Sequence, residues 1–276
     1  PAAVVATVMV LCGFFYKLAL FPFHFWVPDV YEGSANETTS FIATVPKLAA
    51  VALLLRMVTM IDSSGDIMLK LLMICSILSM FYGNLAALVQ KDIKRMLGYS
   101  GIAHAGFVLL GLLVFHITGY AHAAYYITGY VVMNLACFLV ICSVATQGEN
   151  VQIDDLAGLY KRSPLLALTL LIGLFALAGI PPFVGFMGKF FILVDALKQD
   201  YLLLVTLAAI NTAIAIYYYL SIVRVAFCTA DEEQPAISTP VHVKMLSVLL
   251  MAIILIMGVF PTQFILYAEN TILAIL

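Results

Sequence analysis

Long apolar runs separated by short polar segments make up nearly the whole chain. A helix that spans a bilayer needs about 20 predominantly apolar residues. Stretches of that length occur at 2–30, 39–61, 67–90, 95–116, 120–146, 164–197, 201–228 and 242–260. The pattern predicts an all-α polytopic membrane protein. We expect a bundle of about eight transmembrane helices in a single domain over residues 1–276, with a short tail after Pro261 at the membrane interface.

Two of these runs are interrupted, at residues 20–24 (LFPFH) and 179–182 (GIPP). Proline removes a backbone donor and clashes with the preceding turn, so a helix breaks there. Unsatisfied backbone groups cost several kcal/mol each in lipid, so a break must face protein or a wet cavity. A pair of Gly/Pro-interrupted spans therefore indicates a transport site. The alternative is an ordinary proline kink.

The composition agrees with lipid as the main solvent. Hydrophobic residues make up 64% of the chain and charged residues only 10%, whereas a soluble domain carries about 25% charged residues. The net charge of −2 gives no reason to expect nucleic acid as a partner. The sequence has no nucleotide, haem or iron–sulfur motif, and the scattered cysteines resemble small apolar residues. We expect no cofactor in this chain.

Basic residues give the expected orientation. The loops after the first, third, fifth and seventh spans hold or adjoin Lys91, Lys94, Arg95, Lys161, Arg162, Arg224 and Lys244. The other loops have only Arg56, Lys70 and Lys198 nearby. Cytoplasmic loops carry an excess of lysine and arginine. We therefore place the odd-numbered loops on the cytoplasmic or matrix side, and both chain ends on the opposite side.

Three lysines, Lys17, Lys47 and Lys189, lie inside apolar sequence. Each costs about 2.5–3.5 kcal/mol at the centre of a membrane helix, so such residues generally serve a function. An ammonium in apolar surroundings is disfavoured, so a buried lysine can gain and lose a proton near neutral pH. These lysines are candidates for a proton relay. The alternative is snorkelling, in which the stem carries the ammonium to the headgroups.

His104 lies centrally in the fourth span, and its side-chain type is suited to proton transfer near neutral pH. The alternative is a hydrogen-bonded core histidine. Tyrosines including Tyr99, Tyr126 and Tyr130 add hydroxyls, although most tyrosines here are expected to pack or to anchor at the interface. His116 and His122 flank a loop and are expected to be exposed.

Polar residues cluster after the first break. His24 lies within it, and Asp29 and Glu32 follow it. These carboxylates are expected at the cytoplasmic mouth, where they could supply protons to the bundle or contact a neighbouring subunit. A solvated helix end is the alternative.

Three motifs carry a family resemblance. Residues 15–33 (FYKLALFPFHFWVPDVYEG) resemble the seventh-helix signature of the antiporter-like subunits of complex I, the NADH:quinone oxidoreductase. Residues 93–104 (IKRMLGYSGIAH) resemble the family's ninth-to-tenth helix connection, and residues 178–190 (AGIPPFVGFMGKF) resemble its broken twelfth helix. The lysine in residues 44–47 (TVPK) and the VYEG of residues 30–33 resemble the N-type subunit.

The resemblance implies that Lys17, Lys47, His104 and Lys189 form the central proton relay, with Lys189 leading toward the exit. It implies a non-redox subunit of a proton-translocating complex, with flavin, iron–sulfur clusters and quinone in other subunits. The expected partners are other membrane subunits, including neighbouring antiporter-like ones, together with internal water and lipid. The expected location is a bacterial plasma membrane or the mitochondrial inner membrane.

The chain corresponds to the C-terminal, eight-helix part of the family's fold, within an inverted-repeat arrangement. The family glutamate that pairs with the position of Lys17 is absent from this sequence. The nearest alternative function is a subunit of a multisubunit sodium/proton antiporter or membrane-bound hydrogenase. A single-chain solute transporter and a non-conducting scaffold are further alternatives. The electron donor, the quinone type and the order of proton steps stay open.

Overall fold

The computed structural model describes residues 2–59, 66–145, 148–228 and 235–275. These residues form α-helices and one 3-10 helix, with no strand among them. The helices are α1 (Ala2–Leu18), α2 (Trp26–Gly33), α3 (Asn36–Thr59), α4 (Asp66–Ala87), α5 (Ile93–Leu112), α6 (Ile117–Val144), η1 (Ile153–Leu156), α7 (Leu159–Arg162), α8 (Pro164–Ala178), α9 (Val184–Lys198), α10 (Leu202–Phe227), α11 (Val241–Val259) and α12 (Pro261–Ile275). The expected span ends at residues 61 and 146 lie outside the described residues.

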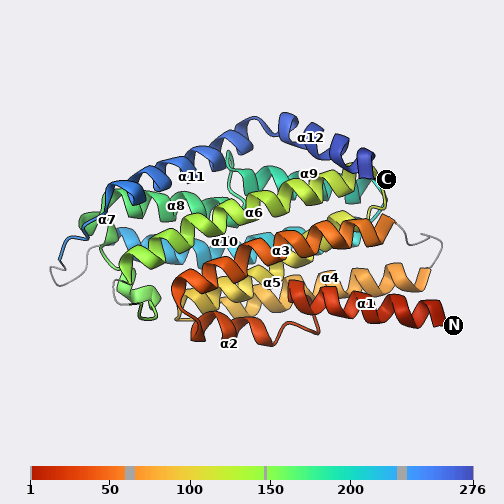
Figure 1. Cartoon of the computed structure of the whole chain (residues 1–276), viewed down its shortest axis with the longest axis horizontal. Helices are drawn as coiled ribbons and strands as arrows, with labels where there is room; N and C mark the ends of the chain where they lie inside the picture. Colours follow the sequence, from red (N-terminus) through yellow and green to blue (C-terminus); the bar gives the residue numbers. More distant parts are fainter. Residues whose placement is uncertain (1, 60–65, 146–147, 229–234, 276) are drawn as a thin grey trace.

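The long helices run side by side along the long axis of the molecule (Figure 1). The helices long and apolar enough to cross a membrane are found at Asn36–Val58, Leu69–Ala87, Ile117–Val144, Leu202–Phe227 and Val241–Val259. The apolar helices at Val8–Leu18 and Pro164–Ala178 are shorter, and each lies beside one of the expected breaks. The all-α, multi-pass membrane architecture predicted from the sequence is confirmed.

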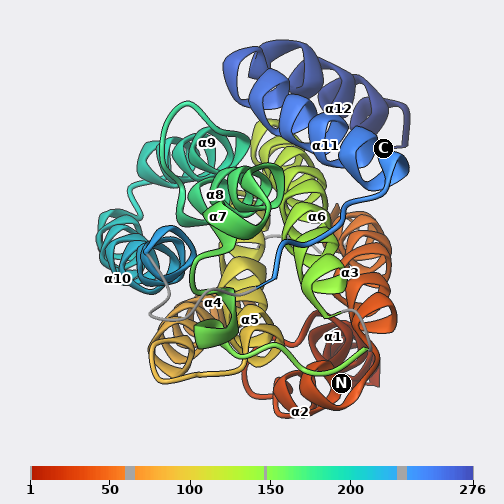
Figure 2. The ribbon, with the colours of Figure 1, turned by 90° about the vertical axis from the view of Figure 1, so that its left-hand side faces the viewer.

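Helices α5 and α6 lie in the interior of the bundle. Nearly every residue of α5 is buried, and α6 packs against α3, α5, α8, α9, α11 and α12. The end-on view in Figure 2 shows α6 between α3 and the α8–α9 pair, with the α11–α12 pair outside it. Gly83 lets α4 approach α5 closely, because a Cβ there would lie 2.6 Å from the backbone oxygen of Tyr99. Polar side chains on α5 and α6 are therefore held away from lipid.

The first break lies between α1 and α2, as the sequence predicted. Ala19 adopts a left-handed conformation (φ 60°) directly after the end of α1. The Phe21 amide donates to the Ser79 hydroxyl on α4 at 2.9 Å, and the Trp26 indole donates to the Tyr16 carbonyl at 2.8 Å. Backbone groups freed by the break therefore find partners inside the protein, as an apolar environment requires.

The second break lies between α8 and α9. Gly179 ends α8 in the left-handed region (φ 86°) that favours glycine. The start of α9 then passes very close to α8: a Cβ at Gly185 would lie 1.8 Å from the backbone oxygen of Ala176. The sequence around the two prolines thus folds into two half-helices that stay in contact.

The connections that carry the predicted cytoplasmic basic residues gather at the end of the bundle that holds α2 and α7, and both chain ends lie at the other end (Figure 1). The segment after Pro261 differs from the expected short interfacial tail. It forms α12, which packs along α6. Its apolar residues Ile265 and Ile272 contribute to that packing, which explains the helix.

Candidate functional site

Lys47 and Lys189 both lie in the protein interior. Their exposed fractions are 2% and 4%, so neither reaches the surface of the bundle by snorkelling. Lys47 comes from the middle of α3, directly after the intrahelical Pro46. Lys189 comes from the second turn of α9, just beyond the second break. The structure therefore keeps two ammonium groups inside an apolar bundle.

Aromatic side chains surround Lys47. Its Nζ donates to the Tyr130 hydroxyl at 3.5 Å and lies 5.7 Å and 5.6 Å from the ring centroids of Tyr31 and Tyr130. Gly101 on α5 leaves the space for this contact, because a Cβ there would lie 2.7 Å from both the Lys47 nitrogen and the Tyr130 oxygen. Ring faces and a hydroxyl stabilise this cation without a full opposing charge.

Lys189 binds the broken end of α8. Its Nζ donates to the carbonyls of Leu177 and Ala178 at 3.0 and 3.2 Å, and it lies 5.2 Å from the ring centroid of Phe107. The last carbonyls of a helix lack an intrahelical partner and carry a partial negative charge. The second break thus creates the acceptors that hold this lysine.

Neither lysine has a carboxylate partner in the part of the chain that the structure describes. Examples of carboxylates that do meet basic side chains there are Asp29 and Glu32 with Arg95, and Asp195 with His122 and Lys198. A carboxylate at 4 Å would favour the ammonium strongly over the neutral amine. Without one, both protonation states can be accommodated, as a proton relay requires.

His104 forms the centre of a hydroxyl network. Its Nδ1 lies 2.6 Å from the Tyr126 hydroxyl and its Nε2 lies 3.2 Å from the Tyr219 hydroxyl. The Tyr219 hydroxyl in turn hydrogen-bonds Ser100. A hydroxyl both donates and accepts, so these partners satisfy either tautomer of the imidazole. This geometry is compatible with both interpretations of His104, a member of a proton relay and a hydrogen-bonded core histidine.

The tyrosines connect the histidine to the lysines. The Tyr130 ring, which contacts Lys47, lies 5.1 Å from the His104 ring. Tyr126, which bonds His104, packs against Gly188, next to Lys189. No direct hydrogen bond joins His104 to either lysine among the described residues. Tyr126 and Tyr130 were among the tyrosines expected to add hydroxyls, but their particular partners were not predicted.

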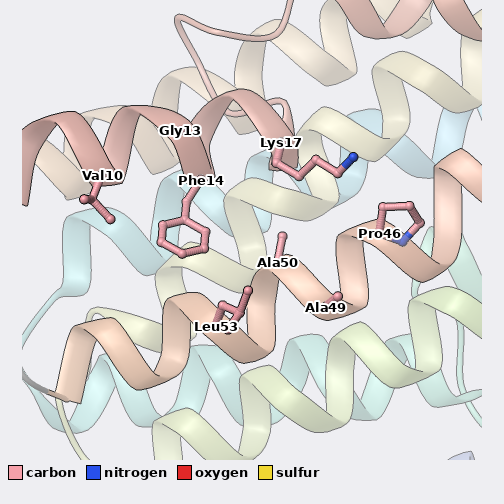
Figure 3. Close-up of a pocket in the computed structure, with 8 residues that line it drawn as sticks. All are labelled: Val10, Gly13, Phe14, Lys17, Pro46, Ala49, Ala50 and Leu53. Carbon is pink, nitrogen blue, oxygen red and sulfur yellow. The ribbon is translucent and has the colours of Figure 1, made fainter.

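Lys17 lies apart from this network. Its side chain is exposed and lines a shallow groove between α1 and α3 (Figure 3). The groove has a volume of about 560 Å³, and its other lining residues are apolar or glycine: Val10, Gly13, Phe14, Pro46, Ala49, Ala50 and Leu53. The role of Lys17 in a relay stays a prediction, because no described residue links Lys17 to the His104 network.

His24 is buried in the first break. It packs against the rings of Phe21, Phe25 and Tyr82, with centroids 5.5, 4.3 and 4.1 Å away. Neither of its ring nitrogens has a hydrogen-bond partner among the described residues. It is thus held by aromatic packing and makes no contact with the His104 network.

The acidic residues after the first break bind one arginine. Arg95 donates to Asp29 and Glu32, at 2.7 Å each, and lies 5.9 Å from the Tyr99 ring centroid. Lys94, beside it, is fully buried and donates to the Ser34 carbonyl at the end of α2 at 2.7 Å. These contacts fix α2 against the start of α5, so the carboxylates have a structural role at this end of the bundle.

The expectation that His122 is exposed is wrong. Its side chain is only 12% exposed and forms an ion pair with Asp195 of α9, while the Phe191 ring stacks on it at 4.9 Å. Asp195 was not among the residues predicted to have a role. His116 is exposed, as expected, and caps the start of α6.

The described residues contain no group of three or more His, Cys, Asp or Glu side chains that could hold a metal ion. The polar groups in the interior are mostly hydroxyls, amides and amines rather than metal-ligand clusters.

Comparisons with known proteins agree with this architecture. The chain is 53% identical, over 95% of its length, to NADH-quinone oxidoreductase subunit N 2 of Opitutus terrae, and it covers 55% of that relative. Its fold superposes with a TM-score of 0.83 on a chain of respiratory complex I from Thermus thermophilus at 35% identity, covering 94% of this chain and 58% of that one. A chain of the Mrp complex from Dietzia shares the fold at 19% identity with a TM-score of 0.89, covering 99% of this chain and 60% of that one.

The chain thus spans little more than half the length of the curated relatives it matches. The resemblance to the N-type subunit is confirmed by these relatives. Residues 1–215 match the family described as NADH:quinone oxidoreductase/Mrp antiporter, TM, and together these findings show that the chain belongs to this family of membrane subunits.

Proposed function

We propose that this chain conducts protons as part of an N-type subunit of an NADH:quinone oxidoreductase. The observation that carries the proposal is the pair of buried lysines, Lys47 and Lys189, which have no carboxylate partner among the described residues and lie near the His104 hydroxyl network. A relay needs groups that exchange protons and lie close enough for water or hydroxyls to bridge them. The interior of this bundle supplies both.

In this proposal a proton passes between Lys47 and the His104 region by way of Tyr130. The Tyr130 hydroxyl contacts the Lys47 ammonium, and its ring lies against the imidazole. Water and hydroxyls complete the connection in this proposal, and Gly101 matters because a Cβ there would lie 2.7 Å from both the Lys47 nitrogen and the Tyr130 oxygen and would push the two groups apart. From His104 the proton reaches Lys189 past Tyr126, and Lys189 leads it toward the exit.

The chain itself performs no redox step in this proposal. Electron transfer takes place in other subunits, which supply flavin, iron–sulfur clusters and quinone, and the free energy arrives here as conformational or electrostatic change. The end of the bundle that holds Lys94 and Arg95 faces the cytoplasm or matrix, in line with the excess of basic residues there. Neighbouring membrane subunits are the proposed partners. Lys17 would join the relay only when another segment or subunit covers its groove.

The relationship to subunit N favours this function over a sodium/proton antiporter. The similarity to the Mrp complex is 19% identity, which shows a common fold alone. The relatives named as NADH-quinone oxidoreductase subunit N reach 53% identity.

The test is proton pumping by the assembled complex in sealed vesicles, measured as protons moved per electron delivered to quinone. Lys47→Ala should lower this ratio strongly, and Lys47→Arg should also lower it, because arginine keeps the charge but does not release its proton. Lys244→Ala, at an exposed lysine on α11, is the matched control. A wild-type ratio in both Lys47 variants and in Lys189→Ala would refute the relay, while full retention in Lys47→Arg alone would make Lys47 a structural cation.

A further inference from the structure

A second group of ionisable side chains lies outside the network already described. His122, near the start of α6, pairs with Asp195 in the last turns of α9, and Lys198 donates to the other oxygen of the same carboxylate at 3.3 Å. The group lies near the end of the bundle that holds both chain termini (Figure 1). This is the end opposite the predicted cytoplasmic loops.

The helix α6 links this group to the relay. Tyr130, Tyr126 and His122 occur at intervals of four residues, so their side chains share one face of the helix, one turn apart. Each of the three meets an ionisable side chain from a different helix. Tyr130 meets Lys47 of α3, Tyr126 meets His104 of α5, and His122 meets Asp195 of α9.

The exposed fraction of the side chains rises in steps from His104 through His122 to Lys198. His104 is 4% exposed, His122 is 12% exposed and Lys198 is 69% exposed. Asp195 is itself 2% exposed, yet it touches both the buried histidine and the exposed lysine. The group therefore reaches from the apolar interior to the water at the end of the bundle.

Helix α9 supplies the second link. Asp195 follows Lys189 by six residues, which corresponds to about 9 Å along the helix axis. It follows Gly188 by seven residues, so it lies on the same face of α9 as the glycine that packs against Tyr126. The contact between α6 and α9 thus has the relay at one level and the His122–Asp195 pair further out, by one turn along α6 and about two turns along α9.

We propose that His122 and Asp195 form the proton-release site of this chain, through which protons from the relay leave to water at the end of the bundle opposite Lys94 and Arg95. The imidazole accepts a proton arriving past Tyr126 and passes it to water, which returns the imidazole to its neutral form. Asp195 holds the ring in place and stabilises the imidazolium while the proton is present. Lys198 orients the carboxylate from the outer side, and Phe191 covers the ring face against lipid.

This inference rests on the proposed function, and the same vesicle assay tests both. His122→Gln and Asp195→Asn keep the size of each side chain but remove proton exchange. We expect each to lose at least as large a share of the pumping ratio as Lys189→Ala in the same preparation. His116→Gln is the matched control, because His116 is an exposed histidine at the same helix end whose side chain hydrogen-bonds Thr118 and, among the described residues, meets no carboxylate. Its ratio should equal that of the wild type.

A purely structural pair would behave differently. His122→Lys keeps a cation against Asp195, and so keeps the tie between α6 and α9, but a lysine beside a carboxylate holds its proton more tightly than an imidazole does. We expect the ratio to stay low in His122→Lys. Recovery to the wild-type ratio would overturn the inference and leave the pair as a helix-to-helix tie.

The remaining outcomes separate the two proposals. A wild-type ratio in His122→Gln together with a loss in Lys189→Ala would refute the release site and keep the relay. Wild-type ratios in both would refute both. If His122→Gln fails to assemble, Asp195→Asn decides, because the asparagine still accepts a hydrogen bond from His122 and leaves the exposed Lys198 in water.

Discussion

Replacing Lys189 by methionine separates the stability of the second break from its role in proton transfer. Methionine keeps the length and flexibility of the side chain but removes the charge and the donor. In the structure, the Lys189 ammonium donates to the Leu177 and Ala178 carbonyls at the end of α8. The variant leaves these two carbonyls without that donor inside the bundle.

Two opposing terms set the expected change in stability. Leaving a buried acceptor unsatisfied costs about 1–3 kcal/mol for each group. Removing a buried lysine charge recovers about 2.5–3.5 kcal/mol on membrane insertion scales. For the two carbonyls together the cost is about 2–6 kcal/mol, so the free energy of unfolding should lie between a gain of about 1.5 kcal/mol and a loss of about 3.5 kcal/mol. Proton transfer, in contrast, has no substitute group at this position.

We therefore expect Lys189→Met to assemble and to show a thermal midpoint close to that of the wild type, while the pumping ratio in sealed vesicles falls strongly. Quinone reduction is measured in the same vesicles, so that loss of the whole complex is distinguished from loss of coupling. Full pumping with normal assembly would refute the reasoning that Lys189 carries protons. If Lys189→Met failed to assemble while Lys189→Arg assembled normally, the main role of the Lys189 cation would be to bind the carbonyls at the second break.

Two further substitutions test the packing. Gly185→Ala should disrupt the contact between the half-helices and lower the thermal midpoint, because the added methyl would lie 1.8 Å from a backbone carbonyl oxygen. Gly13→Ala, where nothing lies within 4 Å of the added methyl, should leave the thermal midpoint unchanged. Asp92→Ala should lower the free energy of unfolding by about 0.5–2 kcal/mol, because the Asp92 carboxylate at the start of α5 accepts a hydrogen bond from the Arg95 amide at 2.8 Å. Faster amide exchange in that turn, with recovery in Asp92→Asn, is the expected result, and unchanged exchange would contradict the capping role.

The sequence predicted the spans and both breaks well, because each rests on a strong local signal. Apolar length defines a membrane helix, and proline with glycine interrupts one. The burial of Lys47, Lys189 and His104 followed from their positions far from polar boundaries. The helix after Pro261 was missed because its mixed apolar and polar residues do not form a long apolar run.

The partners of the buried groups could not be predicted from the sequence. A helix that is apolar on all sides gives no periodic signal for which face points inward. The pairing of His122 with Asp195 joins residues 73 positions apart on different helices, and nothing local marks either residue. The partners of the Tyr126 and Tyr130 hydroxyls could not be predicted for the same reason. The position of Lys17 likewise depends on what lies across its groove.

The hydrogen bonds from Lys189 to the end of α8 affect how easily Lys189 changes its protonation state. The end of a helix offers roughly half of an elementary charge, spread over several carbonyls, whereas an aspartate or glutamate would offer a whole one. An acceptor of this strength stabilises the Lys189 ammonium less than a carboxylate would. A smaller change in the charge nearby is then needed to shift the equilibrium between the protonated and neutral forms of Lys189. Interrupting a helix in the middle of the bundle therefore gives the protein a partial negative charge beside Lys189 without a carboxylate.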